Sequence, residues 1–121
     1  MTTLDQALQG EAPTLIKIDV EGYETAVLAG AQATLAQPSL HTVILELSGN
    51  DRYYSVDESQ LRESLLKLGF QAYAYDPFTR TLTSLAQQPL PSGNTLFIRA
   101  EALVRDRLRQ APKFTIHGQA L

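Results

Sequence analysis

Apolar and polar positions follow two different spacings along this chain, and the spacing predicts where strands and helices form. Two nearly continuous apolar runs, 14–19 (TLIKID) and 42–47 (TVILEL), are typical of strands covered on both faces. Lys17 interrupts the first run, and its ammonium can reach a carboxylate or solvent while its stem lies along the sheet. Apolar positions between the two runs recur at helical spacing and predict one helix over 21–36: Val27, Leu28, Ala31 and Leu35.

The second half of the chain predicts a further helix and a set of shorter elements. The helix is capped by Ser55 or Asp57 and stops at Gly69. Its inward-facing positions are Leu61, Leu65, Leu66 and Leu68. The remaining predicted elements are a helical turn over 4–8, strands over 71–75, 80–85 and 94–99, and a helix over 101–110.

This order of elements predicts the fold class. A strand, helix and strand in succession require a right-handed parallel crossover, and residues 76–79 (DPFT) read as the turn of a hairpin. We therefore expect a three-layer α/β fold with four to five mostly parallel strands and an antiparallel strand near the edge. The whole chain, 1–121, is expected to form one domain, with a lead-in over 1–12, a core over 13–99, and a terminal helix and tail over 100–121.

Composition narrows the class of protein. Hydrophobic residues make up 44% and charged residues 19% of 121 residues, which is typical of a globular domain. The net charge of −3 gives no basic footprint, so nucleic acid and anionic membranes are not expected partners. Cysteine is absent, which fits a reducing compartment. The first 13 residues lack the pattern of a signal peptide, so the expected location is the cytoplasm.

The candidate chemistry lies at the ends of the two apolar strands. The segment LIKIDVEGYE carries Asp19 to the carboxyl end of its strand, where ligands bind in parallel α/β sheets. Glu46 ends the next strand and lies beside Asp19 if the two strands are parallel neighbours. With Asn50 behind them, these two acids would form a polar floor for a hydroxylated acceptor. The alternative for Glu46 is simple solvation, and the alternative for Asp19 is a helix N-cap.

The other residues of this segment also have two interpretations each. Glu21 is either catalytic or a carboxylate that the helix dipole favours in a first turn. Gly22 allows a close backbone approach or a permissive turn. Tyr23 either lines the acceptor pocket or belongs to the core. For Glu24 we expect a salt bridge with Lys17 or exposure to solvent, and we expect no metal site among these acids.

Four segments together resemble a known family: TLDQAL, LIKIDVEGYETAVLAGAQATL, VILEL and NTLFI, within residues 3–99. They resemble the C-terminal half of FkbM-type methyltransferases, which are S-adenosylmethionine-dependent O-methyltransferases of the Rossmann-like class. The resemblance implies methylation of a hydroxyl on a sugar or secondary metabolite. It implies catalytic roles for Asp19 and Glu21 and contacts to the cofactor from Asp19 and Gly22. The acceptor would meet Glu46, Asn50, Tyr23 and Tyr53.

The resemblance also implies that part of the site is missing. In that family a glycine-rich turn and an acidic residue on an earlier strand bind the cofactor, and this chain has no G-x-G pattern. We therefore expect the chain alone to bind S-adenosylmethionine poorly and to be inactive. The strand over 15–19 would then have an open edge, where we expect either self-association or pairing with an N-terminal half. The alternative function is a non-catalytic remnant that serves as an oligomerisation or interaction module.

Overall fold

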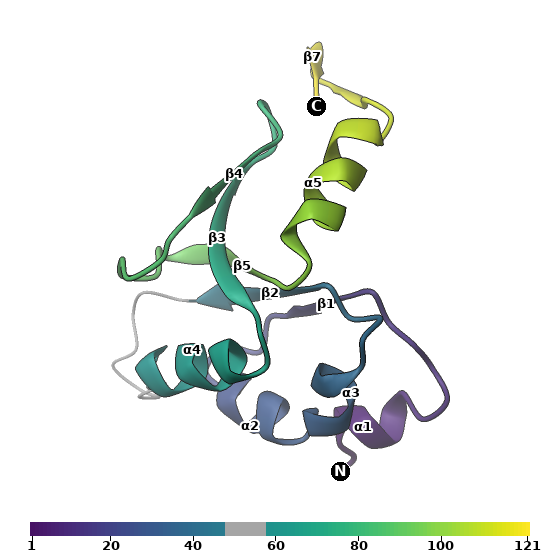
Figure 1. The fold of residues 1–121 in the computed structure, drawn as a ribbon, viewed down its shortest axis with the longest axis vertical. Helices are drawn as coiled ribbons and strands as arrows, with labels where there is room; N and C mark the ends of the chain where they lie inside the picture. Colours follow the sequence, from purple (N-terminus) through teal and green to yellow (C-terminus); the bar gives the residue numbers. More distant parts are fainter. Residues whose placement is uncertain (48–57) are drawn as a thin grey trace.

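The computed structural model describes residues 1–47 and 58–121 (Figure 1). The helices are α1 (Leu4–Ala7), α2 (Glu24–Ala29), α3 (Gln32–Ala36), α4 (Glu58–Lys67) and α5 (Glu101–Gln110). The strands are β1 (Leu15–Ile18), β2 (Thr42–Leu47), β3 (Gln71–Asp76), β4 (Thr81–Ser84), β5 (Gly93–Ile98), β6 (Thr115–Ile116) and β7 (Gln119–Ala120). Within the described residues, each predicted strand is present, and the segment after residue 112 adds a small hairpin, β6–β7, that was not predicted.

The main sheet has the strand order β1-β2-β5-β3-β4. The β1–β2 pair is parallel, as the strand-helix-strand order requires. The other pairs, β2–β5, β5–β3 and β3–β4, are antiparallel. The prediction of a mostly parallel sheet was therefore wrong. The reason is that β5 inserts between β2 and β3 in the opposite direction, so the antiparallel strand lies inside the sheet as well as at the β4 edge.

Helices cover the two faces of the sheet unequally. Figure 1 shows α1, α2, α3 and α4 on one face and α5 on the other. The larger core lies under the first face, where Val43, Leu45 and Phe97 of the sheet meet side chains of the helices. Those helix residues are Leu28, Leu35, Leu61 and Leu65. Leu66 is exposed, so it does not face inward as predicted.

The predicted helix over 21–36 is two helices in the structure. The first ends at Gly30, whose N–H is shared between the carbonyls of Ala26 and Val27, and Ala31 lies between the helices. Thr3 packs against Gly30 so closely that a Cβ there would lie 3.2 Å from the Thr3 Cβ. Gly30 therefore marks close packing against the start of α1.

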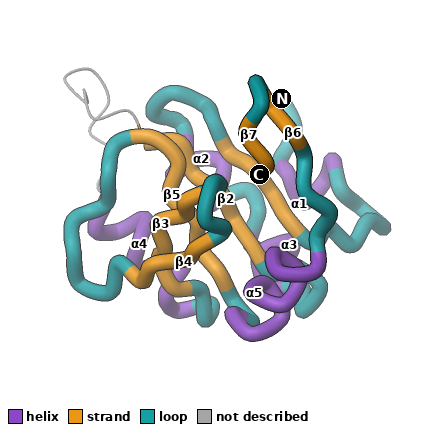
Figure 2. The backbone as a smooth tube through the Cα atoms, turned by 90° about the horizontal axis from the view of Figure 1, so that it is seen from above, coloured by secondary structure: helices purple, strands orange, loops and turns teal. Residues whose placement is uncertain are grey.

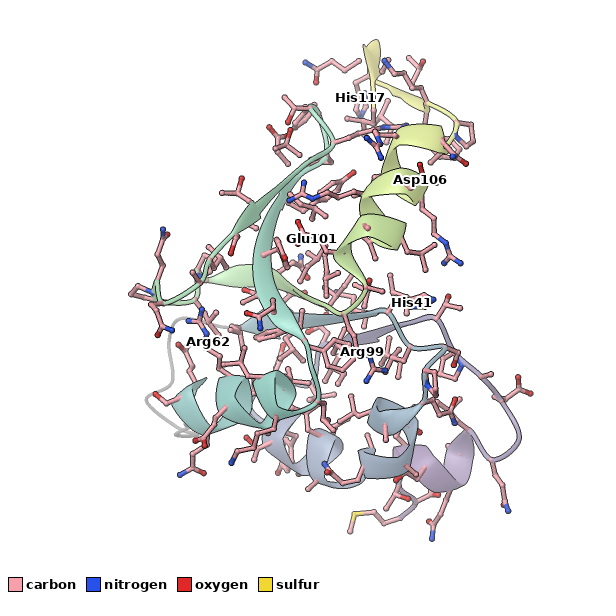
Figure 3. All side chains as sticks on the ribbon, viewed as in Figure 1. His41, Arg62, Arg99, Glu101, Asp106 and His117 are labelled. Carbon is pink, nitrogen blue, oxygen red and sulfur yellow. The ribbon has the colours of Figure 1, made fainter. Side chains whose placement is uncertain are left out.

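A polar network holds α5 on the second face of the sheet. The Tyr73 hydroxyl on β3 donates to Glu101 at 2.7 Å, and Glu101 also accepts from Arg105 at 2.6 Å (Figure 3). Burial, followed by the bond to the Glu101 carboxylate, raises the pKa of Tyr73 to about 12. The Tyr73 hydroxyl and Arg105 lower the pKa of Glu101 in return. Apolar contacts of Val104 and Leu108 complete this small second core.

Arg99, directly after β5, ties the helical layer to the sheet. Its guanidinium donates to the carbonyls of Leu68, Gln37 and Leu40, at 3.1, 2.5 and 2.9 Å. It also lies 4.5 Å from the centre of the Phe70 ring. These carbonyls follow α3 and α4, so one side chain satisfies acceptors beyond the ends of two helices. Among the helices of the described residues, none has the length and apolar character needed to span a bilayer.

Candidate functional site

The carboxyl ends of β1 and β2 bring three charged side chains together. Because the strands are parallel and Ile18 pairs with Leu45, the next residues along, Asp19 and Glu46, lie at the same edge of the sheet. Lys17 bridges them: its Nζ lies 3.1 Å from Asp19 Oδ2 and 3.0 Å from Glu46 Oε2. The predicted neighbourhood of the two acids is thus present in the structure. For Lys17, our expectation allowed its ammonium to reach either a carboxylate or solvent, and the structure shows contacts with both carboxylates.

This cluster is open to solvent, and its two carboxylates share one cation. The side chains of Lys17, Asp19 and Glu46 are 46%, 47% and 41% exposed. The hydrogen bond to Glu46, and next the one to Asp19, raise the pKa of Lys17, so the ammonium stays charged throughout the neutral range. Lys17 neutralises one of two carboxylates, which leaves a net negative, accessible edge.

A tight turn follows Asp19. The Tyr23 N–H donates to the Val20 carbonyl at 3.4 Å, and the two residues between them, Glu21 and Gly22, have φ angles of +48° and +98°. Positive φ at both central positions is the requirement of a mirror-image type I′ turn, and Gly22 adopts it without steric cost. The prediction that Gly22 provides a permissive turn conformation therefore agrees with its backbone.

Glu24 secures this turn from inside the protein. Its carboxylate accepts the Gly22 N–H at 3.0 and 3.2 Å, and the residue is only 3% exposed. The expectation of a salt bridge with Lys17 or exposure to solvent was wrong. The reason is that α2 begins at Glu24, so the side chain folds back under the turn that precedes the helix. The sequence signal for this contact is the segment E-G-Y-E. Its second acid, Glu24, stands two residues after the glycine whose N–H it accepts.

Two of the structural alternatives for the acids are also wrong. Asp19 is not the N-cap of the following helix: the N-cap position of α2 is Tyr23, four residues further on. Glu21 is not in the first helical turn, since it precedes the helix and is exposed. Neither position is therefore explained by helix capping or by the helix dipole, and their exposed carboxylates at the sheet edge need another account.

The other residues that we assigned to the site are not gathered at this edge. Tyr23 is 58% exposed, so it does not belong to the core, and it lines an apolar groove of about 700 Å³ between α1 and α2. Asn50 and Tyr53 lie outside the described residues. Asn94 on β5, which was not assigned to the site, pairs with Glu46 in the sheet and lies one strand further from Asp19. Neither histidine joins the cluster, since His41 lies beside the sheet and His117 on the tail (Figure 3).

Among the residues that the structure describes, no group of three His, Asp or Glu side chains is placed to hold an ion. The charged groups at the carboxyl ends of β1 and β2 are two carboxylates and one ammonium. A carboxylate can accept a proton or a hydrogen bond from a hydroxyl, and an acidic edge attracts a cationic ligand.

Comparison with known proteins adds one finding. The model of the family described as the methyltransferase FkbM domain matches residues 1–72, which include α1, β1, the turn, α2, α3 and β2. The matched stretch therefore contains Lys17, Asp19, Glu24 and Glu46. A search of curated proteins and a search of solved structures each found no match.

Proposed function

This chain belongs to the FkbM methyltransferase family, and we propose that its acidic edge is one wall of an S-adenosylmethionine-dependent O-methyltransferase site. The acceptor would be a hydroxyl of a sugar or secondary metabolite. The observation that carries the proposal is the Asp19–Lys17–Glu46 bridge at the carboxyl ends of two parallel strands. That edge is where α/β folds bind ligands.

The residues at this edge suit one part of the cofactor. S-adenosylmethionine supplies an electrophilic methyl group on a cationic sulfonium, and the exposed Asp19 and Glu46 carboxylates favour a cation nearby. The glycine turn at Gly22 lets a ligand approach the backbone closely. No G-x-G pattern is present in the sequence to receive the adenosine portion. We therefore assign the chain the sulfonium side of the site and the acceptor.

The proposed roles follow from the contacts. Asp19 takes the proton that the acceptor hydroxyl loses as its oxygen gains the methyl group. Lys17 holds the carboxylates of Asp19 and Glu46 in place, because its ammonium contacts both. Glu46 accepts a hydrogen bond from the acceptor. Glu24 maintains the turn through Gly22 and so keeps Asp19 at the edge.

Amide chemical shifts in an NMR titration with S-adenosylmethionine, which carries the sulfonium charge, test this proposal on the chain itself. We expect the amides of 19–22 to shift, with a Kd in the range of about 0.1–1 mM because only part of the cofactor is contacted. Asp19→Asn should weaken the response at least about tenfold, whereas Asp106→Asn, on α5, should not change it. Absence of any shift at these amides, or shifts that persist unchanged in Asp19→Asn, would contradict the proposal.

One observation favours a second candidate function. β1 lies at an edge of the sheet, as expected of a strand that pairs with another polypeptide. A non-catalytic oligomerisation or interaction module would bind its partner along the outer side of β1 and would not need the carboxylates of Asp19 and Glu46. Under this alternative, S-adenosylmethionine shifts no amide in the wild-type protein or in the Asp19→Asn variant, while variants of the β1 edge change the state of association.

A further inference from the structure

Three exposed apolar side chains lie at one end of the molecule. Phe78 stands in the turn between β3 and β4, and Phe114 and Ile116 follow α5; these side chains are 62%, 65% and 53% exposed. Figure 1 shows that turn and the β6–β7 hairpin at the same end, and Figure 2 looks onto it. Single exposed apolar side chains are ordinary on a protein surface, whereas a group of them marks an interaction surface.

Arg80 joins the β3–β4 turn to the segment that follows α5. Its guanidinium donates at 2.6 to 3.0 Å to four carbonyls, those of Leu108, Ala111, Pro112 and Leu121. The turn and this segment also line one cavity of about 190 Å³, to which Pro77 and Phe114 both contribute. A surface whose backbone is already fixed in this way loses less conformational freedom when it binds a partner.

The β6–β7 hairpin gives its apolar side chains a common direction. The N–H and C=O of Phe114 both bond to Leu121, at 3.1 and 2.7 Å, so the hairpin ladder begins at Phe114. Because alternate residues of a strand point to the same side, Phe114 and Ile116 share one face of the hairpin. This face is exposed at both positions.

The segment that carries two of these side chains is basic. Residues 101–121 contain four Lys or Arg against two Asp or Glu, although the whole chain contains 10 against 13. Arg107 and Lys113 are exposed, and within the described residues neither makes an ion pair. The net charge of −3, from which we expected no anionic membrane partner, therefore averages an acidic part and a basic part of the chain.

The two acids nearest these residues in sequence are already engaged. The Asp76 carboxylate accepts the N–H groups of Phe78 and Thr79 within the turn, at 2.9 and 3.4 Å. The Asp106 carboxylate accepts from Gln110 at 2.8 Å and lies 3.7 Å from the guanidinium of Arg109. Neither carboxylate neutralises Arg107 or Lys113, so this end of the molecule is complementary in charge to an anionic partner.

We propose that this end, defined by Phe78, Phe114, Ile116, Arg107 and Lys113, binds the surface of an anionic phospholipid bilayer. Aromatic and aliphatic side chains insert at the boundary between headgroups and acyl chains, and neighbouring Lys and Arg meet the anionic headgroups. Nucleic acid also attracts cations and stacks its bases on aromatic side chains. Ile116 favours the bilayer, because an aliphatic side chain has no ring for a base to stack on. The proposal does not depend on methyl transfer.

An introduced indole tests insertion at one position, because the sequence contains no tryptophan. In Phe114→Trp, vesicles of phosphatidylcholine with about 30 mol% phosphatidylserine should shift the indole emission to shorter wavelength. Lipids brominated on their acyl chains should quench that emission. Leu66→Trp, at an exposed apolar position on α4, is the matched control and should show neither effect. Vesicles of phosphatidylcholine alone should bind at least about fivefold more weakly.

Co-sedimentation with the same anionic vesicles separates the two contributions. The double variant Arg107→Glu with Lys113→Glu should bind at least about tenfold more weakly, and so should Phe114→Ser with Ile116→Ser. Lys67→Glu, which changes an exposed cation on α4, should bind like the wild-type protein. Circular dichroism checks that each variant is folded. If the serine variant does not fold, the charge variant and the indole emission decide.

Three results would overturn the proposal. The first is a wild-type protein that does not sediment with vesicles at about 1 mM lipid. The second is binding that survives both double variants, since the contact must then lie elsewhere. The third is a single-stranded oligonucleotide that binds more tightly than the vesicles and loses its binding in the same variants, which would assign this surface to nucleic acid.

Discussion

The carboxylate of Asp5 caps helix α3 from a separate helix, accepting the Thr34 hydroxyl at 2.6 Å and the Thr34 N–H at 2.8 Å. It also accepts the Ala33 N–H at 3.0 Å. Helix N-termini carry unsatisfied N–H groups and a partial positive charge, so an anion there is stabilising. The TLDQAL and LAGAQATL segments, distant in sequence, are joined by this contact. The cap explains why a new helix begins directly after the break at Gly30.

Asp5→Ala should destabilise the fold. The three hydrogen bonds are lost and the Thr34 hydroxyl is buried without a partner, so we expect the Tm to fall by about 5 °C. The same bonds lower the pKa of Asp5 in the folded protein, with the Thr34 hydroxyl as the largest cause. Its contribution is therefore complete above the ordinary value of 3.8 and is lost as the pH falls below it. Thermal melts at neutral and acidic pH, with Glu11→Ala as the exposed control, measure both effects.

Gly30→Ala should be destabilising for a steric reason. The φ of Gly30 is −89°, which any residue can adopt, so backbone strain is not involved. The new Cβ would lie 3.2 and 3.3 Å from Cβ and Cγ2 of Thr3. We expect a loss of about 1 kcal/mol in the free energy of unfolding. Urea denaturation should show a smaller loss in a Thr3→Gly background, where the obstructing atoms are absent; equal losses would exclude this contact as the cause.

Glu24→Ala should disrupt the turn that follows β1. The partly buried Gly22 N–H loses its acceptor, and the free energy of unfolding should fall by about 2 kcal/mol. Glu24→Gln keeps an acceptor oxygen and should cost less. Glu21→Asn is the matched control, because it removes a neighbouring exposed carboxylate while asparagine tolerates the positive φ. Denaturation curves for the three variants decide; similar losses for Glu24→Gln and Glu24→Ala would mean that volume, and not the hydrogen bond, matters.

Tyr73→Phe should remove an alkaline transition. Because folding raises the pKa of Tyr73 from 10.0 to about 12, its stabilising contribution is complete below pH 10.0 and disappears as the pH rises through about 12. The wild-type protein should therefore lose stability over this window more steeply than Tyr73→Phe. Ultraviolet absorbance of tyrosinate reports the pKa of Tyr73, and urea melts across this pH window report the free energy of unfolding. Tyr23→Phe removes an exposed phenol and should retain the wild-type slope.

Local patterns determined much of this structure. The apolar runs predicted β1 and β2, the hairpin turn at 76–79 was placed correctly between β3 and β4, and the helix over 101–110 matches α5. These elements depend on the spacing of apolar residues and on turn-forming residues, which interact over a few positions. The same reasoning placed Asp19 and Glu46 at one edge, because parallel neighbours end on the same side.

Only the tertiary structure decided the remaining features, because each depends on contacts between residues far apart in the chain. The insertion of β5 between β2 and β3 makes the sheet mostly antiparallel, and no local pattern specifies which strand becomes a neighbour. The division of the helix at Gly30 depends on Thr3 and Asp5. The burial of Glu24 depends on a turn that delays the start of α2. The sequence by itself thus determined the elements and the acids, and the packing of distant segments determined their order, their ends and the lysine bridge.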